Sequence, residues 1–239
     1  MNGKVVLVTG ASRGIGAATA IKLAERGLNV VLNYRGKTAR AEEVAARIRE
    51  LGQKALLAQA DLTVSTEIEA MIQLVREKFT RLDVLILNAS GGLEKDKAED
   101  YAMALNFTAQ LETAQLAAAL MPAGGRIVFI TSHWAHFYGE KPVMPAYEPV
   151  AKSKKAGEEA LRQYALELNA KDISLLVVSG DAIEGTITPR LLNRMSPGVM
   201  ASRQGTLPSV DEFAAAISAA ALDDSLPSGH TVFVGSTDY

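Results

Sequence analysis

The chain has 239 residues, 48% of them hydrophobic and 22% charged, and this length and balance predict one globular domain with a sizeable core. Its 25 basic and 27 acidic residues lie in no long block of one sign, so nothing favours a nucleic acid or an anionic membrane as partner. The absence of cysteine excludes disulfides, thiolate metal sites and cysteine nucleophiles. No apolar run reaches the roughly 18 residues that span a bilayer, so we expect a soluble cytoplasmic protein that acts on a small molecule.

Short apolar strands alternate with helices along the chain. The strands are apolar at nearly every position, which is typical of strands buried on both faces, and helical crossovers return the chain to a parallel neighbour. The sequence therefore predicts an α/β fold, a doubly wound parallel sheet in a single domain over residues 1–239. The expected strands are 4–8, 30–33, 55–58, 84–87, 126–130, 175–178 and 231–234, and the expected helices are 17–25, 38–51, 65–79, 98–120, 150–169 and 210–221.

Residues 183–209 depart from this alternation and are rich in Gly, Pro and Thr. A long excursion beyond the carboxyl end of a strand often forms a lid, so we predict a substrate lid here. Its apolar residues would line a cleft and its arginines would bind an anionic group, unless the segment is an amphipathic helix with solvated arginines. The residues concerned are Leu191, Leu192, Met195 and Met200, with Arg190, Arg194 and Arg203.

A glycine-rich turn joins the first predicted strand to the first helix. Glycines let the backbone approach a pyrophosphate, and the amides and dipole of the helix can hold it. We therefore expect a dinucleotide to bind here, the alternative being a turn that merely packs tightly. The residues expected to contact it are Gly10, Ser12, Arg13, Gly14, Ile15 and Gly16.

Residues 9–16 read TGASRGIG and resemble the cofactor motif of the short-chain dehydrogenase/reductase family, which is spaced Gly-x-x-x-Gly-x-Gly. The resemblance covers essentially the whole chain and implies a Rossmann fold with a nicotinamide cofactor. Asp61 and Leu62 lie where the family contacts adenine, and Asn88 and Ala89, in residues 87–90, match two positions of the family's Asn-Asn-Ala-Gly. Residues 127–132 resemble the strand with the catalytic serine, and residues 229–235 resemble the closing strand.

The end of the second strand bears on which nicotinamide cofactor binds. An acidic residue there selects NAD through the ribose 2'-hydroxyl, whereas a 2'-phosphate needs cations. This chain has Asn33 at that position, and Arg13 and Arg35 offer two guanidiniums without a carboxylate. We therefore expect NADP rather than NAD, the alternative being that Arg35 and Lys37 are solvated turn residues.

The resemblance implies four catalytic residues. The family uses a tyrosine as general acid/base, a lysine four residues later that lowers the pKa of the tyrosine, a serine that orients the substrate oxygen and an asparagine that holds a water. Ser132 and Asn106 match the serine and the asparagine. No tyrosine of this chain has a lysine four residues later.

Helical phase identifies Lys154 as the family's lysine. Counted at about 100° per residue from Val150, it falls on the apolar stripe of its helix, where a lysine needs a polar partner such as the cofactor ribose. Lys152 and Lys155 fall on the opposite face, where we expect solvent. Val150 then occupies the tyrosine position, and an aliphatic side chain cannot transfer a proton.

Tyr147 is the candidate that replaces the missing tyrosine. Ser132 and Lys154 are about five residues further apart than in the family, so the loop between them is enlarged. Pro149 suits the first helical position, which leaves Tyr147 just outside the helix with its hydroxyl able to swing into the vacated site. Tyr138 as the acid and a structural role for Tyr147 stay open.

Two further segments lie near the predicted site. His133 and His136 flank the enlarged loop and titrate near neutral pH, but we expect loop packing and no metal, because no carboxylate or third ligand accompanies them. Where the family has Pro-Gly and a threonine that contacts the nicotinamide, this chain has Gly180 without the proline, followed by Thr186 or Thr188. We expect Gly180 to contact the cofactor in a reshaped pocket.

The function that the resemblance implies is an NADP-dependent oxidoreductase that moves hydride between the nicotinamide and a ketone or secondary alcohol. The absent tyrosine also permits an NADP-binding sensor or scaffold without turnover, or a reaction in which the substrate supplies its own proton. The helices with Asn106 and Lys154 are long and alanine-rich, and relatives bury them between subunits, so we expect a homodimer or homotetramer. The alternative is that the alanines let these helices lie close to the sheet.

Overall fold

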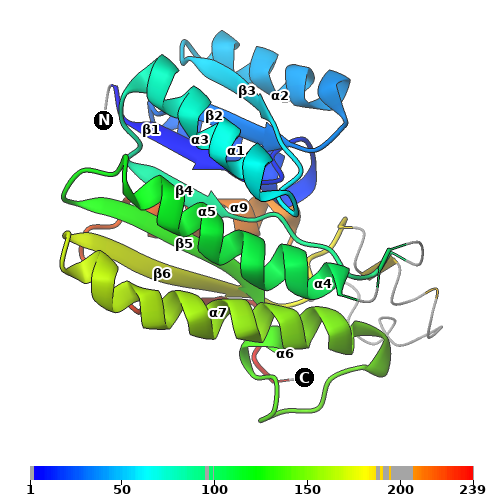
Figure 1. Ribbon diagram of the computed structural model, residues 1–239. Coiled ribbons are helices and arrows are strands. Elements are labelled where there is room, and N and C mark those ends of the chain that lie inside the picture. Colours follow the sequence, from blue (N-terminus) through cyan, green and yellow to red (C-terminus); the bar gives the residue numbers. More distant parts are fainter. Residues whose placement is uncertain are drawn as a thin grey trace.

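In a computed structural model of the protein, the described residues form one sheet of seven parallel strands with helices on both faces (Figure 1). The structure describes residues 3–94, 97–98, 100–186, 189–190, 194 and 207–238. This is the doubly wound α/β fold that the sequence predicts. In spatial order the strands are β3 (Ala55–Gln59), β2 (Asn29–Tyr34), β1 (Val5–Val8), β4 (Val84–Leu87), β5 (Gly125–Ser132), β6 (Ile173–Gly180) and β7 (Thr231–Val234).

Each face of the sheet has its own apolar core. Alternate residues of a strand point to opposite faces, so Val5 and Leu7 of β1 join one core, and Val6 and Val8 join the other. Both cores exclude water, which is why the strands are apolar at nearly every position. The first core packs against α3 (Ser65–Phe79), α5 (Ala109–Ala118) and α7 (Glu148–Asn169), and the second against α1 (Gly14–Glu25), α2 (Thr38–Glu50) and α9 (Val210–Leu222) (Figure 1).

Two stretches differ from the sequence prediction. The predicted helix 98–120 consists of α4 (Tyr101–Met103), a π-helical turn (Ala104–Thr108) and α5. The predicted loop after β5 contains the short helix α6 (His133–His136) and a 3-10 turn (Pro145–Tyr147). The second stretch lies within the enlarged segment that separates Ser132 from Lys154.

Much of the predicted lid, residues 183–209, lies outside the described residues, and so do Thr188, Leu191, Leu192, Met195, Met200 and Arg203. The strand order reverses between β1 and β4, and in such sheets ligands bind beyond the carboxyl ends of the strands at that point. Across the described part of the chain, no helix is long and apolar enough to cross a membrane.

Candidate active site

A cavity of about 690 Å³ opens beyond the carboxyl ends of β1, β4, β5 and β6. It lies at the reversal of strand order, where the fold predicts a ligand site. Its lining is mostly apolar, with a few polar groups from segments far apart in the sequence. Of the predicted cofactor and catalytic residues, Arg13, Ile15, Asn88, Ser132, Tyr147, Lys154 and Gly180 line it.

The glycine turn between β1 and α1 borders this cavity. Gly10 and Gly14 have φ of +64° and +55°, a backbone region that favours glycine. A Cβ on Gly16 would come within 2.5 Å of both Asn88 Nδ2 and the Gly10 carbonyl. Helix α1 begins at Gly14 inside the turn, so the amides of its first turn have no intrahelical acceptor and suit an anionic ligand.

Asn33 lies beneath this turn rather than on its surface. Its side chain is buried, and its Oδ1 accepts a hydrogen bond from the Gly10 amide at 3.2 Å. Its Nδ2 donates to the carbonyls of Ala58 and Ala60 at 3.3 and 3.2 Å. The sequence places Asn33 at the cofactor ribose, but the structure uses its amide to join the glycine turn to the ends of β2 and β3.

The expected adenosine end of the site is more open. Arg13 and Arg35 are both exposed, and Arg35 Nη1 donates to Tyr101 Oη at 2.9 Å. Burial raises the pKa of Asp61, but hydrogen bonds from Thr63 and the charges of Arg35 and Lys97 outweigh it and hold that pKa below its usual value. Asp61 is therefore ionised at neutral pH. Ser12 is half-buried and Leu62 is buried.

The loop after β4 is attached to the end of β1 through Thr9. The Thr9 hydroxyl accepts from the amides of Asn88 and Ala89 at 2.9 and 3.0 Å, and Asn88 Nδ2 donates to the Thr9 carbonyl at 2.9 Å. Thr131 is among the lining residues across the cavity, and its buried hydroxyl has no hydrogen-bond partner among the described residues. The glycine turn, with its helix amides beside the cavity, fits the pyrophosphate of a nicotinamide dinucleotide.

The hydroxyls of Ser132 and Tyr147 meet at the cavity wall, with 3.0 Å between Oγ and Oη. Tyr147 is the last residue before α7, and its ring packs edge-on against Trp134 with 5.1 Å between centroids. Burial raises the pKa of the Tyr147 phenol, and the hydrogen bond with Ser132 offsets part of this effect. The phenol is therefore protonated at neutral pH and can donate a proton. Tyr138, the alternative, is partly exposed and donates to the Glu148 carboxylate at 3.0 Å.

Lys154 is buried in α7 and reaches the same cavity. Its Nζ donates to the Ile130 carbonyl at 3.1 Å, and burial lowers the pKa of the ammonium to about 8. Val150, one turn earlier, is also buried and lines the cavity. The structure therefore brings Ser132, Tyr147 and Lys154 to one cavity.

Asn106, the fourth predicted catalytic residue, lies away from the cavity that the other three line. It is buried in the π-helical turn, where its Nδ2 donates to the Gly91 carbonyl at 2.8 Å and to Ser153 Oγ at 3.0 Å. Its Oδ1 accepts from the Gly91 amide at 3.2 Å. Asn106 is not among the residues that line the cavity, and it fastens the loop after β4 to α7.

The described residues of the predicted lid contribute at the cavity rim. Thr186 lines the cavity, and its hydroxyl donates to the Ile183 carbonyl at 2.8 Å. Arg194 also lines it, whereas Arg190 is exposed and does not.

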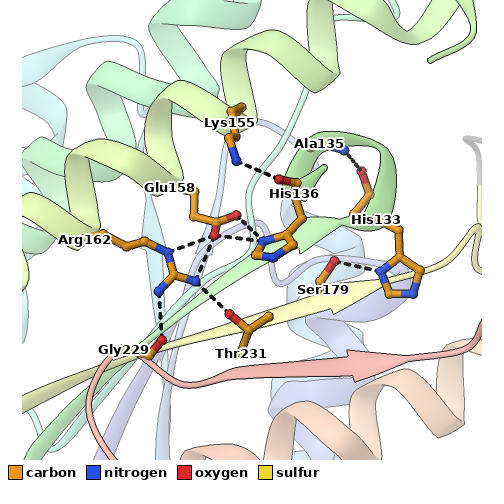
Figure 2. A network of polar contacts seen from close by, with 10 residues as sticks. His133, Ala135, His136, Lys155, Glu158, Arg162, Ser179, Gly229 and Thr231 are labelled. Atoms are coloured by element: carbon orange, nitrogen blue, oxygen red, sulfur yellow. Dashed lines mark hydrogen bonds and ion pairs between the residues drawn. The ribbon is translucent and has the colours of Figure 1, made fainter. Parts of the chain in front are cut away.

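Sequence reasoning missed a polar cluster that joins α6 to α7, which Figure 2 shows. His136 Nδ1 lies 2.8 Å from the carboxylate of Glu158, and Lys155 Nζ donates to the His136 carbonyl at 2.8 Å, so Lys155 is not the solvated residue that its helical phase predicts. His133 Nδ1 lies 2.8 Å from Ser179 Oγ. Glu158 follows Lys154 by four residues and thus shares its apolar stripe, a signal that could have identified the buried carboxylate.

Comparisons with known proteins show the family to which this chain belongs. Residues 4–194 match the short chain dehydrogenase family. The chain is 34% identical over 206 residues to hydroxynaphthalene reductase arp2 of Aspergillus fumigatus, which covers 83% of this chain and 73% of that protein. It is 33% identical over 187 residues to 1-cyclohexenylcarbonyl-CoA reductase of Streptomyces collinus, which covers 76% of this chain and 65% of that protein.

Solved structures are similar over nearly the full chain. A short-chain dehydrogenase from Burkholderia cenocepacia J2315 in complex with NADP superposes with a TM-score of 0.85 at 28% identity, covering 98% of this chain and 97% of that one. The angucycline C-6 ketoreductase LanV with bound NADP gives 0.83 at 28% identity, covering 99% and 96%. The fold, the glycine turn and these similarities together show that the chain belongs to the short-chain dehydrogenase family.

Proposed function

We propose that the protein is an NADP-dependent oxidoreductase that transfers hydride between the nicotinamide and a ketone or secondary alcohol. The observation that carries this proposal is the pair of hydroxyls of Ser132 and Tyr147, 3.0 Å apart, in the cavity that the buried Lys154 also lines. Relatives whose names describe reductases, among them hydroxynaphthalene reductase and LanV, support a carbonyl substrate.

NADP fits the residues that border the cavity. The glycine turn would hold the pyrophosphate, and Lys154 would face the nicotinamide riboside. Two related structures contain NADP, and the exposed Arg13 and Arg35 suit its additional phosphate. When bound, the cofactor supplies or accepts the hydride. The further residues proposed to contact it are Asp61, Leu62, Asn88, Ala89 and Gly180.

In this proposal the protein's own residues orient the carbonyl and move the proton. Ser132 and Tyr147 both donate hydrogen bonds to the carbonyl oxygen, which fixes the substrate and stabilises the negative charge that develops there. The proton then passes from Tyr147 Oη to that oxygen. The ammonium of Lys154 favours the phenolate that is left behind. In the oxidation of an alcohol, the same phenolate accepts the proton.

Replacing Tyr147 by Phe tests the proposal, because it removes the proton donor and keeps the ring. We expect kcat for ketone reduction to fall by about 10²- to 10⁴-fold, the usual contribution of a general acid. The loss of NADPH absorbance with a panel of ketones measures the rate, and calorimetry measures NADPH binding, which we expect to stay unchanged. Tyr138→Phe is the matched control, because this hydroxyl is bonded to Glu148 outside the cavity.

Two outcomes would contradict the proposal. A wild-type rate in Tyr147→Phe would show that another group donates the proton. NADPH binding without oxidation of NADPH by any tested ketone would favour a sensor or scaffold, which the absence of a Tyr-x-x-x-Lys motif permits.

A further inference from the structure

Glu158 is a buried carboxylate in α7, one turn after Lys154, with only 3% of its side chain exposed. His136 Nδ1 lies 2.8 Å from its Oε1 and 3.0 Å from its Oε2, and Arg162 Nε donates to its Oε1 at 2.9 Å (Figure 2). Burial raises the pKa of Glu158, but its bonds to His136 and Arg162 and their charges outweigh this and hold the pKa below its usual value. The carboxylate is therefore ionised, and His136 Nδ1 must be the donor.

Arg162 anchors this carboxylate to the sheet. Its Nη1 donates to the Gly229 carbonyl at 2.8 Å, and its Nη2 donates to Thr231 Oγ1 at 2.7 Å (Figure 2). A guanidinium that is bonded in several directions has little freedom to move. Glu158 thus presents a fixed acceptor to His136.

The helix that Glu158 holds, α6, is too short to be stable by itself. It has four residues, and isolated helices of that length do not form in water. Its last residue is held twice by α7, through the His136 side chain on Glu158 and through the His136 carbonyl on Lys155 Nζ at 2.8 Å. Lys155 and Glu158 are three residues apart and therefore face the same neighbour.

At its other end, α6 adjoins the proposed catalytic pair, Ser132 and Tyr147. Ser132 precedes α6, and its Oγ accepts from the Ala135 amide at 3.3 Å while it bonds to Tyr147 Oη at 3.0 Å. Trp134 inside α6 packs against the Tyr147 ring. A displacement of α6 would therefore disturb both the partner of the Tyr147 hydroxyl and the support of its ring.

Tyr147 needs this support because it lies outside the helix that carries Lys154. A tyrosine four residues before a lysine shares a rigid helix with it, whereas Tyr147 precedes α7 and is seven residues from Lys154. Its ring packs against Ala135 and Trp134 of α6 as well as against the start of α7, so α6 forms one wall of its support.

We propose that Glu158 is a positioning residue, which through His136 holds α6 where the hydroxyls of Ser132 and Tyr147 meet. This inference rests on the proposed function, because the catalytic role of that pair is itself a proposal. The test therefore needs a measurement that does not depend on turnover. Trp134 provides it, because it is the only tryptophan of the chain and lies in α6.

The main variant is Glu158→Gln, which keeps the size of the side chain and removes its charge. We expect its tryptophan emission to shift to longer wavelength and to be quenched more by acrylamide, because α6 loosens. We expect kcat to fall by about ten- to a hundredfold, since a misplacement of about 1 Å has an effect of that order. The affinity for NADPH should stay as in the wild type.

Glu159→Gln is the matched control, because Glu159 is the neighbouring glutamate of the same helix and is exposed. It should leave emission and kcat unchanged. A second pair of variants tests the partner. His136→Leu removes the donor and should behave as Glu158→Gln, whereas His136→Asn keeps an N–H donor near the position of Nδ1 and should restore much of kcat. If Glu158→Gln does not fold, these variants and Lys155→Met carry the test.

Unchanged emission in folded Glu158→Gln overturns the proposal whatever the activity. Altered emission with wild-type kcat also overturns it, because α6 would then move without consequence for the reaction. If the wild-type protein reduces no ketone, the proposed function fails. Altered emission in Glu158→Gln would then still support the structural part of this inference, that Glu158 holds α6 in place.

Discussion

Burial acts in opposite directions on the two titratable residues of the proposed site. It raises the pKa of the Tyr147 phenol and lowers the pKa of Lys154 to about 8, so in each case it favours the uncharged form. A protonated phenol is the form that donates to a ketone oxygen, whereas alcohol oxidation needs the phenolate. The site as it stands is therefore better prepared for reduction at neutral pH.

This asymmetry predicts the pH dependence of the reaction. We expect kcat/KM for ketone reduction to be nearly constant below pH 8 and to fall above it, first as Lys154 loses its charge and then as Tyr147 ionises. Alcohol oxidation should appear only on the alkaline side. Initial rates in both directions between pH 6 and pH 10 measure this, and a reduction rate that rises with pH would contradict it.

The lysine should also lower the stability of the cofactor-free protein. Its pKa is 10.5 when unfolded and about 8 when folded, so between these values the unfolded chain binds more protons, and stability rises with pH through that window. Below pH 8 the buried charge lowers the free energy of unfolding by its full amount, on the order of 3 kcal/mol for this pKa shift. Lys154→Met should therefore be inactive but more stable than the wild type at pH 7.

Urea unfolding of both proteins at pH 7 and pH 10.5 measures this effect. The stability difference between them should be largest at pH 7 and much smaller at pH 10.5, where the lysine is neutral in the folded protein and about half neutral in the unfolded chain. A difference that does not change with pH would show that the loss of the bond to the Ile130 carbonyl, and not the buried charge, separates the two proteins.

Single residues were predictable where one pattern decides their environment. Lys154 was placed by helical phase alone, because a helix of 22 residues has a clear buried stripe. The surroundings of Asn33 could not be predicted in this way, because every residue of β2 after the first is buried. The pattern does not tell which side chain at the end of a strand turns toward a ligand. The apolar stripe could have identified Glu158 as buried, but not its partner His136, which is distant in sequence and meets it only in the folded chain.

At the scale of elements, α7 and the π-helical turn pack so closely that only glycine fits between them. A Cβ on Gly157 would lie far inside van der Waals contact with the Asn106 carbonyl, which is backbone and cannot rotate away. We expect Gly157→Ala to destabilise the protein by about 1–3 kcal/mol, the usual cost of overpacking. It should also lower kcat, because α7 carries Lys154.

Chemical unfolding and NADPH-dependent turnover measure both effects. Gly36→Ala is the control for stability, since a Cβ there meets nothing within 4 Å. Equal stability of Gly157→Ala and Gly36→Ala would show that the helix and the turn can separate without cost.

The strands and long helices were predictable because two cores impose apolar residues on every strand and a stripe on every helix. Helix α6 and the π-helical turn were not. Four residues show no period, and the turn depends on bonds such as Asn106 to Gly91 that the sequence does not reveal. The geometry that joins Tyr147 to Ser132 therefore lay beyond sequence reasoning, which could only propose the two residues as candidates.

At the scale of the whole molecule, the proposed cofactor would contact segments from both halves of the sheet, so its binding should stabilise the entire fold. A ligand at 100 times its Kd adds about 2.7 kcal/mol. For a domain of this size, each kcal/mol raises Tm by about 2–4 °C, so NADPH should raise Tm by roughly 5–10 °C. NADH should raise it less at the same concentration, because it lacks the phosphate that the exposed Arg13 and Arg35 would bind.

Arg35→Ala should reduce the difference between the Tm increases that NADPH and NADH produce. Raising the salt concentration should reduce that difference further, because exposed charges are screened. Arg76→Ala is the matched control, since Arg76 is an exposed arginine of α3 on another part of the surface. Thermal unfolding of the three proteins with NADPH, NADH and no cofactor measures the effect. Equal shifts with both cofactors in the wild type would contradict the preference for NADP. If the preference for NADPH over NADH persists unchanged in Arg35→Ala, other residues bind the additional phosphate of NADPH, and Arg13 is the first of these to test.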